Sequence, residues 1–295
     1  MTRGFSENTF MQNTAGILYI VATPIGNLDD LTPRALHVLG GVNLIVAEDT
    51  RHSKKLLQHF NLQTPLRSLH EHNERARIAE LLDLLYQGQQ IAVISDAGTP
   101  LIRDPGYHLV HAAHENGIRV VPIPGACAAI AALSAAGLPA DRFVFEGFLP
   151  AQSSARLRHL QELVTETRTL IFYETPHRIV AMLQDALNVF GAERHTVLAK
   201  ELTKVFETIH AAPLGELLDW LQQDENRRRG EFVVLVAGAA ESPALQQAAL
   251  PTGQLLAILL AELSLKQAVK IASQITGLKK NYVYELALKQ TSAER

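Results

Sequence analysis

The sequence predicts an α/β protein with two α/β domains of different sheet type and a small helical tail. Compact apolar runs alternate with helical periodicity over the first 125 residues, which is typical of a mostly parallel sheet covered on both faces. After Asp141 the spacing changes, and the close succession of strands between Thr196 and His210 suits antiparallel pairing and a mixed sheet. From about Ala240 the composition shifts to short helical segments. We therefore expect a flexible tail at 1–15, an N-terminal α/β domain at 16–146, a second α/β domain at 147–240, and a linker with a basic helical tail at 241–295.

In the first domain, each apolar run ends in a turn and is followed by a helix. Thr32 and Pro33 are typical of a helix start, and Asn73 is a good cap for a later helix. The expected strands are Ile17–Ala22, Val42–Ala47, Ile91–Ser95 and Arg119–Ile123.

After Asp141 the alternation continues with different spacing, and Gly147–Gln152 is the expected hinge between the domains. A cleft between two such domains is a usual ligand site. The expected strands are Phe143–Phe145, Thr169–Tyr173, Thr196–Ala199, Val205–His210 and Phe232–Val236, and the expected helices are Ser153–Val164, His177–Phe190 and Leu214–Gln222.

Three helical segments are expected in the tail, at Gln254–Leu263, Lys266–Ile275 and Asn281–Lys289. Ser264 can cap the second and Gly277 can end it, which gives helix-turn-helix spacing. From residue 264 to 295 there are six Lys or Arg against two Glu. The tail is either a three-helix bundle with a solvated basic face or a nucleic-acid contact.

The overall composition is that of an ordinary globular protein. It has 295 residues, 47% of them hydrophobic and 19% charged. Its net charge of −3 does not by itself indicate a nucleic-acid partner. A single cysteine, Cys127, excludes an internal disulfide, fits a reducing cytoplasm and makes a Cys-based metal site implausible. No apolar run is long enough to span a membrane, and the polar N-terminus does not resemble a signal peptide. We expect a cytoplasmic protein.

The most informative segment is the loop from Ser95 to Asp104, closed by Pro105 and Gly106. It follows an apolar strand and precedes a helix, and open α/β sheets bind ligands at the carboxyl ends of their strands. Gly98 allows close backbone approach to a ligand, and the two Asp side chains lie at the rim.

Other strand ends carry polar groups as well. The loop from Thr23 to Asp30 contains one glycine, so the dinucleotide fingerprint is absent and an NAD enzyme is disfavoured. The segment from Glu48 to His52 is either a functional strand end or a helix start capped by Asp49 or Thr50, and both can hold together.

Two further segments contain residues of chemical interest. The His70–Glu74 segment superficially resembles metal ligands, but a solvated loop is the better interpretation, and we expect no metal site. The turn at Pro122–Ala129 leads into a helix of small residues, which suits either close helix–sheet packing or a ligand against the helix start. We do not expect Cys127 to be a nucleophile, because no basic residue adjoins it in sequence.

Taken together, these motifs resemble the tetrapyrrole methylase superfamily of S-adenosylmethionine-dependent methyltransferases. In particular, the chain is similar to the branch of that superfamily that methylates the ribose 2′-oxygen of a cytidine in the decoding region of 16S rRNA. The match runs from Gly16 to Lys289 and rests on motifs in fixed order: TPIGNLDDLTPRAL, AEDTRHSKKLLQHF, HEHNE, SDAGTPLIRDPG, PGACAAIAALSAAGLP, FEGFLP, FYETPHR and ELTKVFETIH. Porphyrin-modifying relatives carry Gly-Asp-Pro in the central loop where this chain has Asp-Ala-Gly, so a tetrapyrrole substrate is disfavoured.

The resemblance implies that S-adenosylmethionine binds between the domains. It implies the cofactor-binding residues Pro24, Asp96, Ala97, Gly98, Thr99, Cys127, Ala128, Tyr173, Glu174, Glu231 and Phe232. As candidates for a catalytic base we take Glu48, Asp49 and Glu201. For contact with the RNA of the small ribosomal subunit we take Arg51, Lys54, Arg103, His177, Arg178, Lys279 and Lys280. Members of the superfamily are commonly homodimers, which implies the same here.

Two other functions are open at this point. One is methylation of another acceptor, such as diphthine or a corrinoid intermediate. The other is a ligand-sensing DNA-binding regulator in which the C-terminal helices read the nucleic acid. The crowding of ionisable residues at strand ends favours the enzyme.

Overall fold

The computed structural model describes residues 15–70, 73–240 and 252–293. The chain divides into two compact units, Met1–Ala239 and Ala240–Arg295, and each is described by itself. Most of the expected N-terminal tail and linker, together with Glu71 and His72, lie outside the described residues.

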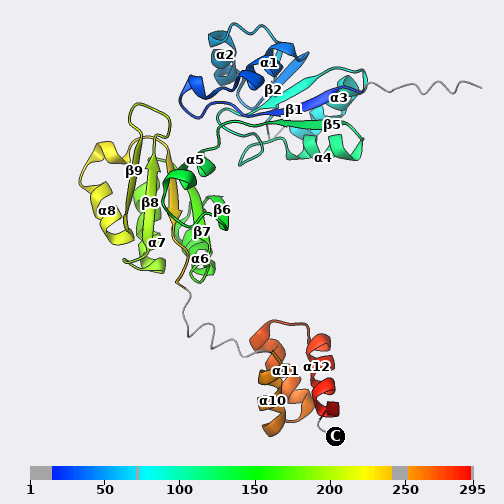
Figure 1. Cartoon of the computed structure of the whole chain (residues 1–295), viewed down its shortest axis with the longest axis vertical. Coiled ribbons are helices and arrows are strands. Elements are labelled where there is room, and N and C mark those ends of the chain that lie inside the picture. Colours follow the sequence, from blue (N-terminus) through cyan, green and yellow to red (C-terminus); the bar gives the residue numbers. More distant parts are fainter. Residues whose placement is uncertain (1–14, 71–72, 241–251, 294–295) are drawn as a thin grey trace, which may run out of the picture. The chain divides into compact units, whose positions relative to one another are not determined.

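The first sheet is parallel, as predicted, with strand order β3-β2-β4-β1-β5 (Figure 1). Its strands are β1 (Ile17–Val21), β2 (Leu44–Ala47), β3 (Leu66–Ser68), β4 (Ile91–Ile94) and β5 (Arg119–Ile123). Its helices are α1 (Pro33–Gly41), α2 (Thr50–His59), α3 (Glu74–Tyr86) and α4 (Tyr107–Glu115), with the short 3-10 helix η1 (Leu28–Asp30). One apolar core joins the sheet to α3 and α4, and another joins it to α1 and α2, so both faces are covered.

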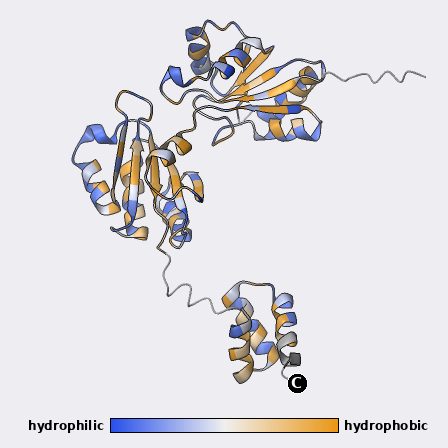
Figure 2. Ribbon diagram, viewed as in Figure 1, coloured by the Kyte–Doolittle hydropathy of each residue, from blue (hydrophilic) through white to orange (hydrophobic). Residues whose placement is uncertain are grey.

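The second sheet is mixed, as predicted, with order β6-β7-β10-β8-β9, in which only the β6–β7 pair is parallel. Its strands are β6 (Phe143–Phe148), β7 (Thr169–Glu174), β8 (His195–Lys200), β9 (Thr208–Pro213) and β10 (Phe232–Val236). Its helices are α5 (Ala128–Ala135), α6 (Ser153–Glu162), α7 (Ile179–Phe190) and α8 (Leu214–Gln222), with the 3-10 helix η2 (Glu225–Arg228). One face packs on α6, α7 and α8 and the other on α5. The strands are hydrophobic along their length, and the helices turn apolar sides to them (Figure 2).

Two strands differ from the prediction. The short edge strand β3 was not expected, because three residues give too little periodicity to recognise. The strand predicted at Val205–His210 overlaps β9 only from Thr208 to His210, because β9 begins at Thr208 and runs to Pro213. Val205 lies 93% exposed in the loop before it, and positive φ angles at Glu201 and Thr203 turn the chain there.

The chain changes sheets earlier than the expected hinge. β6 pairs with β7 in the second sheet, and α5 packs on the same sheet. The change therefore follows β5, whereas the expected hinge at Gly147–Gln152 falls at the end of β6. A helix made of small residues carries no sequence signal for the sheet that it covers.

The helical unit contains α10 (Thr252–Glu262), α11 (Leu265–Thr276) and α12 (Lys280–Ala293). At the start of α11 the Ser264 backbone N–H donates to Gln267 Oε1 at 3.3 Å, and Gly277 ends that helix with φ 69°. A small apolar core of Leu256, Val269, Ala272, Val283 and Ala287 holds the three helices together. The predicted caps and helices of the tail are confirmed.

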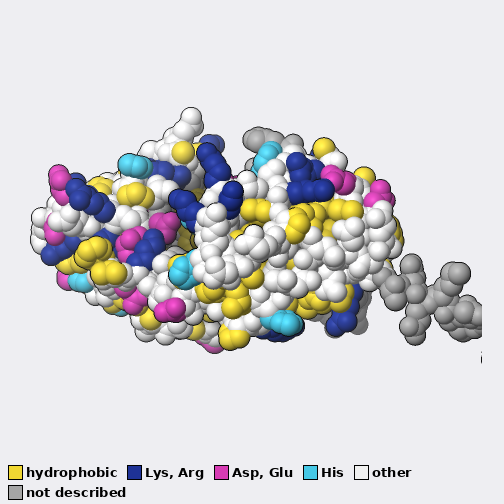
Figure 3. Space-filling view, turned by 90° about the horizontal axis from the view of Figure 1, so that it is seen from above, with side chains coloured by type: hydrophobic (Ala, Val, Ile, Leu, Met, Phe, Trp, Pro, Cys, Tyr) yellow, Lys and Arg dark blue, Asp and Glu magenta, His cyan; other side chains and the backbone are white. Residues whose placement is uncertain are grey.

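The surface of the protein carries both signs of charge. Figure 3 shows a group of Lys and Arg side chains near the middle of the face seen there, beside hydrophobic side chains. Within the described residues, every helix falls short of the length and apolarity that crossing a membrane would require.

Candidate functional site

A cavity of about 680 Å³ lies where the two sheets of the α/β unit meet. Its wall contains the loop after β4, the turn before α5, the end of β7, the start of β10 and the loop between β8 and β9. It therefore gathers most of the residues predicted to bind the cofactor, namely Asp96, Ala97, Gly98, Thr99, Cys127, Ala128, Tyr173, Glu174, Glu231 and Phe232. Pro24 lies instead in the wall of a smaller adjoining cavity.

The loop after β4 is hydrogen-bonded to three other loops. Thr23 and Gly98 exchange backbone hydrogen bonds of 2.9 and 3.1 Å, which ties this loop to the loop after β1. Thr99 Oγ1 donates to the Ala126 carbonyl at 3.0 Å, and the Asp49 backbone N–H donates to Asp96 Oδ1 at 3.1 Å. These bonds hold the ends of four elements in one arrangement around the cavity.

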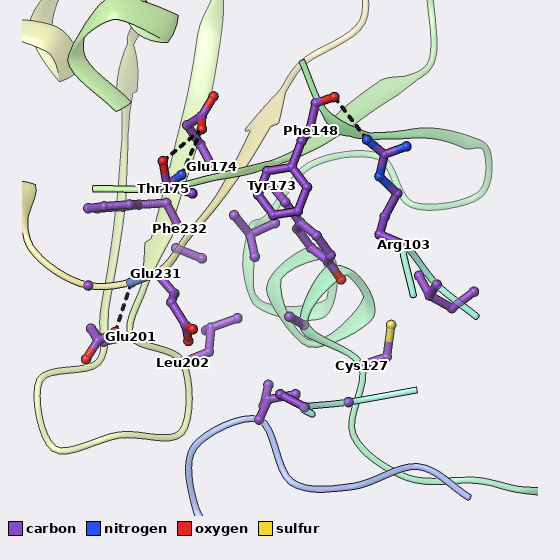
Figure 4. Close-up of a pocket in the computed structure, with 18 of the residues that line it drawn as sticks. Arg103, Cys127, Phe148, Tyr173, Glu174, Thr175, Glu201, Leu202, Glu231 and Phe232 are labelled. Carbon is purple, nitrogen blue, oxygen red and sulfur yellow. Dashed lines mark hydrogen bonds between the residues drawn. The ribbon is translucent and has the colours of Figure 1, made fainter. Parts of the chain in front are cut away.

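The same loop contains strained backbone. Leu101 and Arg103 have φ angles of 70° and 72°, which cost a non-glycine residue of the order of 1–3 kcal/mol. Arg103 Nη2 donates to the Phe148 carbonyl on β6 at 3.1 Å (Figure 4). Gly147 has φ 67°, and a Cβ there would collide with the Arg103 side chain. Arg103, predicted to contact RNA, thus lines the cavity and also ties the first-sheet loop to the second sheet.

Tyr173 forms an aromatic wall of the cavity. Phe145 and Phe148 pack edge-on against its ring, with centroids 5.0 and 5.8 Å away. Its hydroxyl oxygen accepts from the Ala129 backbone N–H at 3.1 Å and, in Figure 4, points toward Cys127. Burial, and then the neighbouring Cys127 thiol, raises the pKa of Tyr173 to about 12. The hydroxyl therefore stays protonated at neutral pH.

The Glu174 carboxylate is buried behind the cavity wall. Its side chain is fully buried, and Oε1 accepts from the Thr175 backbone N–H at 2.8 Å and pairs with Arg178 Nε at 3.3 Å. Oε2 is buried and has no hydrogen-bond partner among the described residues. Burial raises the pKa of Glu174. Because the side chain has no accessible surface, Oε2 does not face the space of the cavity.

Two of the three candidate bases, Asp49 and Glu201, are each paired with a neighbouring basic side chain. Asp49 caps α2 by accepting from the Arg51 backbone N–H at 2.8 Å, and the hydrogen bond from the Arg51 side chain is the main cause that lowers the pKa of Asp49 to about 2. Burial by itself would raise the pKa of Glu201. Hydrogen bonds from Lys204 and from the Glu231 backbone N–H outweigh burial and lower it. Both carboxylates are therefore weak proton acceptors.

Asp104 was not singled out from the sequence as a base, yet it lies in the cavity wall. Burial, and then the charges of Glu48 and Asp96, raises its pKa from the ordinary 3.8 to about 6. Glu48, the third candidate base, is exposed at the end of β2 and acts on Asp104 through this charge. The signal available in the sequence was the second Asp of the loop rim, but its burial depends on tertiary packing.

The residues predicted to contact RNA lie in different places in the structure. Arg178 donates to the Leu149 carbonyl at 2.5 Å and pairs with Glu174, so its guanidinium is engaged within the fold. The exposed candidates outside the walls of both cavities are Arg51, Lys54 and His177. Lys279 and Lys280 are exposed in the helical unit.

One cation at the site was missed from the sequence. Lys204 lies in the walls of both cavities and pairs with Glu201 and Glu231 at 2.9 and 2.8 Å. The sequence interpretation placed this residue just before a strand, whereas it lies in the turn that closes the site. Among the described residues, no group of three or more His, Cys, Asp or Glu could hold a metal ion.

This arrangement of two α/β domains around a cavity is that of a tetrapyrrole methylase. Residues 17–218 match the model of the Tetrapyrrole (Corrin/Porphyrin) Methylases family, and residues 247–291 match the model described as the RsmI C-terminal HTH domain. A solved uroporphyrin-III C-methyltransferase from Thermus thermophilus, complexed with S-adenosylhomocysteine, aligns with a TM-score of 0.51 over 75% of this chain and 97% of that one, at 17% identity. At that identity the likeness concerns the fold.

The curated relatives narrow the family. The protein named ribosomal RNA small subunit methyltransferase I from Pseudomonas aeruginosa is 56% identical over 94% of this chain and 98% of its own length. Its namesake from Escherichia coli O157:H7 is 58% identical over 94% of this chain and 96% of its own length. The chain belongs to the ribosomal RNA small subunit methyltransferase I family.

Proposed function

We propose that this protein transfers a methyl group from S-adenosylmethionine to the ribose 2′-oxygen of a cytidine in the decoding region of 16S rRNA. The observation that carries the proposal is the cavity of about 680 Å³ between the two sheets, walled by the loop after β4, the turn before α5 and Tyr173. The names of the relatives support ribosomal RNA as the substrate. The S-adenosylhomocysteine in a structural neighbour supports the cofactor.

The residues present fit this cofactor. Ala97, Gly98 and Ala128 leave space along one wall, and the loop around Asp96 would hold the methionine end. Tyr173 and the strand ends at Glu174 and Phe232 would line the adenosine. When bound, the cofactor supplies a sulfonium methyl group that is already electrophilic.

The protein's own task is to align the ribose hydroxyl and remove its proton. Alignment for in-line displacement can supply several kcal/mol of the barrier, and a general base typically adds ~10²–10⁴-fold. Among the carboxylates near the cavity, we assign to Asp104 the role of the general base that accepts this proton. It lies in the wall, and its pKa of about 6 leaves it ionised at neutral pH while keeping it basic. Asp49 and Glu201 are neutralised by Arg51 and Lys204.

The remaining expectations concern partners and location. We propose that the substrate is the small ribosomal subunit, that the enzyme is a homodimer as is common in the superfamily, and that it acts in the cytoplasm. Lys279 and Lys280 on the helical unit would contact RNA phosphates. Its surplus of basic residues in an otherwise acidic chain supports this role.

The test is transfer of a labelled methyl group from S-adenosylmethionine. Small ribosomal subunits lacking the modification, small-molecule acceptors and duplex DNA are offered separately, and the product is mapped by mass spectrometry. We expect label on one ribose of 16S rRNA. Label on a small molecule would establish another acceptor, and sequence-specific duplex binding without methylation would establish a regulator. Either result would overturn the proposal.

A further inference from the structure

The positive charge of the chain is concentrated at its C-terminal end, in the helical unit. Residues 264–295 contain six Lys or Arg against two Glu, whereas the whole chain has a net charge of −3. A charge of +4 on this segment and −3 on the whole chain leaves −7 on residues 1–263. Because RNA is a polyanion, this distribution favours the helical unit as the part that supplies electrostatic attraction to it.

Four lysines of the unit are available to an external anion. Lys266, Lys270, Lys279 and Lys280 are exposed, and none of them forms an ion pair with another described residue. Lys280 is the first residue of α12, and the Lys279 carbonyl accepts from the Val283 backbone N–H at 3.2 Å. Cations at this end of a helix are repelled by its dipole, so these two lysines do not stabilise α12. Their positions suit the binding of an anion instead.

Tyr284 lies about one helical turn after Lys280 on α12 (Figure 1). Side chains four positions apart on a helix are neighbours, so the Tyr284 ring and the Lys280 ammonium share one side of α12. Tyr284 is 45% exposed, and its side chain forms no hydrogen bond or ring contact with another described residue. Val283 and Ala287 supply the buried core positions of this helix. An exposed ring beside cations is the combination that proteins use to bind single-stranded nucleic acids.

The helix-turn-helix arrangement of α11 and α12 narrows the kind of RNA that could bind. In DNA-binding proteins of this class, the second helix of the motif enters the major groove. The major groove of duplex RNA is too deep and narrow to be read by side chains, so α12 cannot use it in this way. Contacts to RNA are then left with phosphates and with bases that are already unpaired, as in loops and bulges.

We propose that the helical unit binds an unpaired segment of ribosomal RNA through the side of α12 that carries Lys279, Lys280 and Tyr284. One unpaired base stacks on Tyr284, and the two lysines contact the phosphates that flank it. The unit thus contributes affinity for the substrate and takes no part in holding the donor. This inference rests on the proposed function and adds a stacked base to the phosphate contacts given there.

The first test measures binding of the full-length protein to a single-stranded RNA oligonucleotide, an RNA duplex and a DNA duplex by fluorescence anisotropy. Tyr284→Ala should weaken binding to the single strand at least about fivefold, the loss of one stacked base, and leave binding to both duplexes unchanged. Tyr284→Phe keeps the ring and should bind as wild type. Tyr282→Ala is the control, because Tyr282 is 54% exposed on the same helix but faces a different side, and it should also bind as wild type.

The second test uses small ribosomal subunits and salt. In methyl transfer, Tyr284→Ala should raise the half-saturating subunit concentration by a similar factor, while the affinity for S-adenosylhomocysteine in calorimetry stays that of wild type. Replacing both lysines, Lys279→Gln with Lys280→Gln, should reduce the slope of log affinity for single-stranded RNA against log salt concentration by about 1.4, or about 0.7 for each phosphate contact. Tyr284→Ala should leave this slope unchanged.

The two proposals fail differently. A wild-type enzyme that does not methylate the subunits overturns the proposed function. The role of α12 is overturned if Tyr284→Ala binds single-stranded RNA as wild type, if it loses as much affinity for either duplex, or if Tyr282→Ala shows an equal loss. An unchanged salt slope in the lysine variant also overturns it, and this measurement decides the question if Tyr284→Ala loses helical content. Weaker binding of subunits without weaker binding of RNA would assign Tyr284 to a protein partner and would likewise overturn it.

Discussion

Replacing Asp104 by Asn keeps the shape of the side chain and removes its charge. In the folded protein, burial and then the charges of Glu48 and Asp96 raise the pKa of Asp104 from 3.8 to about 6. That difference corresponds to about 3 kcal/mol for a fully desolvated group. Because Asp104 is only partly buried, solvent screening reduces the contribution to about 1 kcal/mol.

The direction of the stability change depends on whether the folded or the unfolded state binds the Asp104 proton more tightly. The folded state holds the proton of Asp104 up to about pH 6 and the unfolded state only to about pH 4, so this group favours folding most below pH 4. Its contribution is lost as the pH rises through 6. At pH 7.5, Asp104→Asn should therefore raise the free energy of unfolding by about 1 kcal/mol, or the melting temperature by about 2–4 °C. At pH 4 the gain should be much smaller.

Thermal unfolding followed by circular dichroism at pH 4 and pH 7.5 measures the effect. Asp141→Asn makes the same change at an exposed position and serves as the control. In methyl transfer, the wild-type rate should rise with pH through about 6, and Asp104→Asn should lose this rise and about 10²–10⁴-fold in rate. A variant that is destabilised at pH 7.5, or one that keeps the wild-type pH–rate profile, would refute the role given to Asp104.

Two other substitutions test the aromatic wall of the site and a buried ion pair of the second domain. Tyr173→Phe leaves the Ala129 backbone N–H without its acceptor and should destabilise the fold by about 1–3 kcal/mol in urea titrations, whereas unchanged stability would show that another acceptor replaces the hydroxyl. Asp185→Ala strands the buried Arg156, its partner at 2.7 Å, and should cost about 3–5 kcal/mol; a loss below 1 kcal/mol would mean that water reaches Arg156.

The strands of both sheets could be predicted from sequence because most are short, fully apolar runs. Phe232–Val236 has the same limits in the prediction and in the structure, and all five of its residues are buried. The region after Lys200 could not be placed in the same way. Val205 and Phe206 read as strand, but the turn that exposes them depends on backbone angles at Glu201 and Thr203, which are non-glycine residues without a turn signature.

The segments after β1, β2 and β4 were singled out from the sequence, because ligands bind at the carboxyl ends of the strands in open α/β sheets. The structure brings these segments together around the two cavities. The pKa values of individual side chains were not predictable, because they depend on the groups that pack around each side chain in the folded protein. Asp49 and Asp104 are both acidic residues near strand ends. Asp49 is partly exposed beside Arg51, whereas Asp104 is partly buried beside the carboxylates of Glu48 and Asp96. Their pKa values consequently differ in opposite directions from the ordinary value.

The loop after β4 forms part of the wall of both cavities. Asp96 and Ala97 lie in both walls, and Gly98 is held to Thr23 by two backbone hydrogen bonds. A shift of this loop would therefore move the walls of both cavities together. Under the proposed function, this would keep the alignment that in-line transfer requires. The strained angle at Arg103 is offset by its hydrogen bond to the Phe148 carbonyl on the second sheet. The bond that ties the two sheets together thus also holds the aligning loop in place.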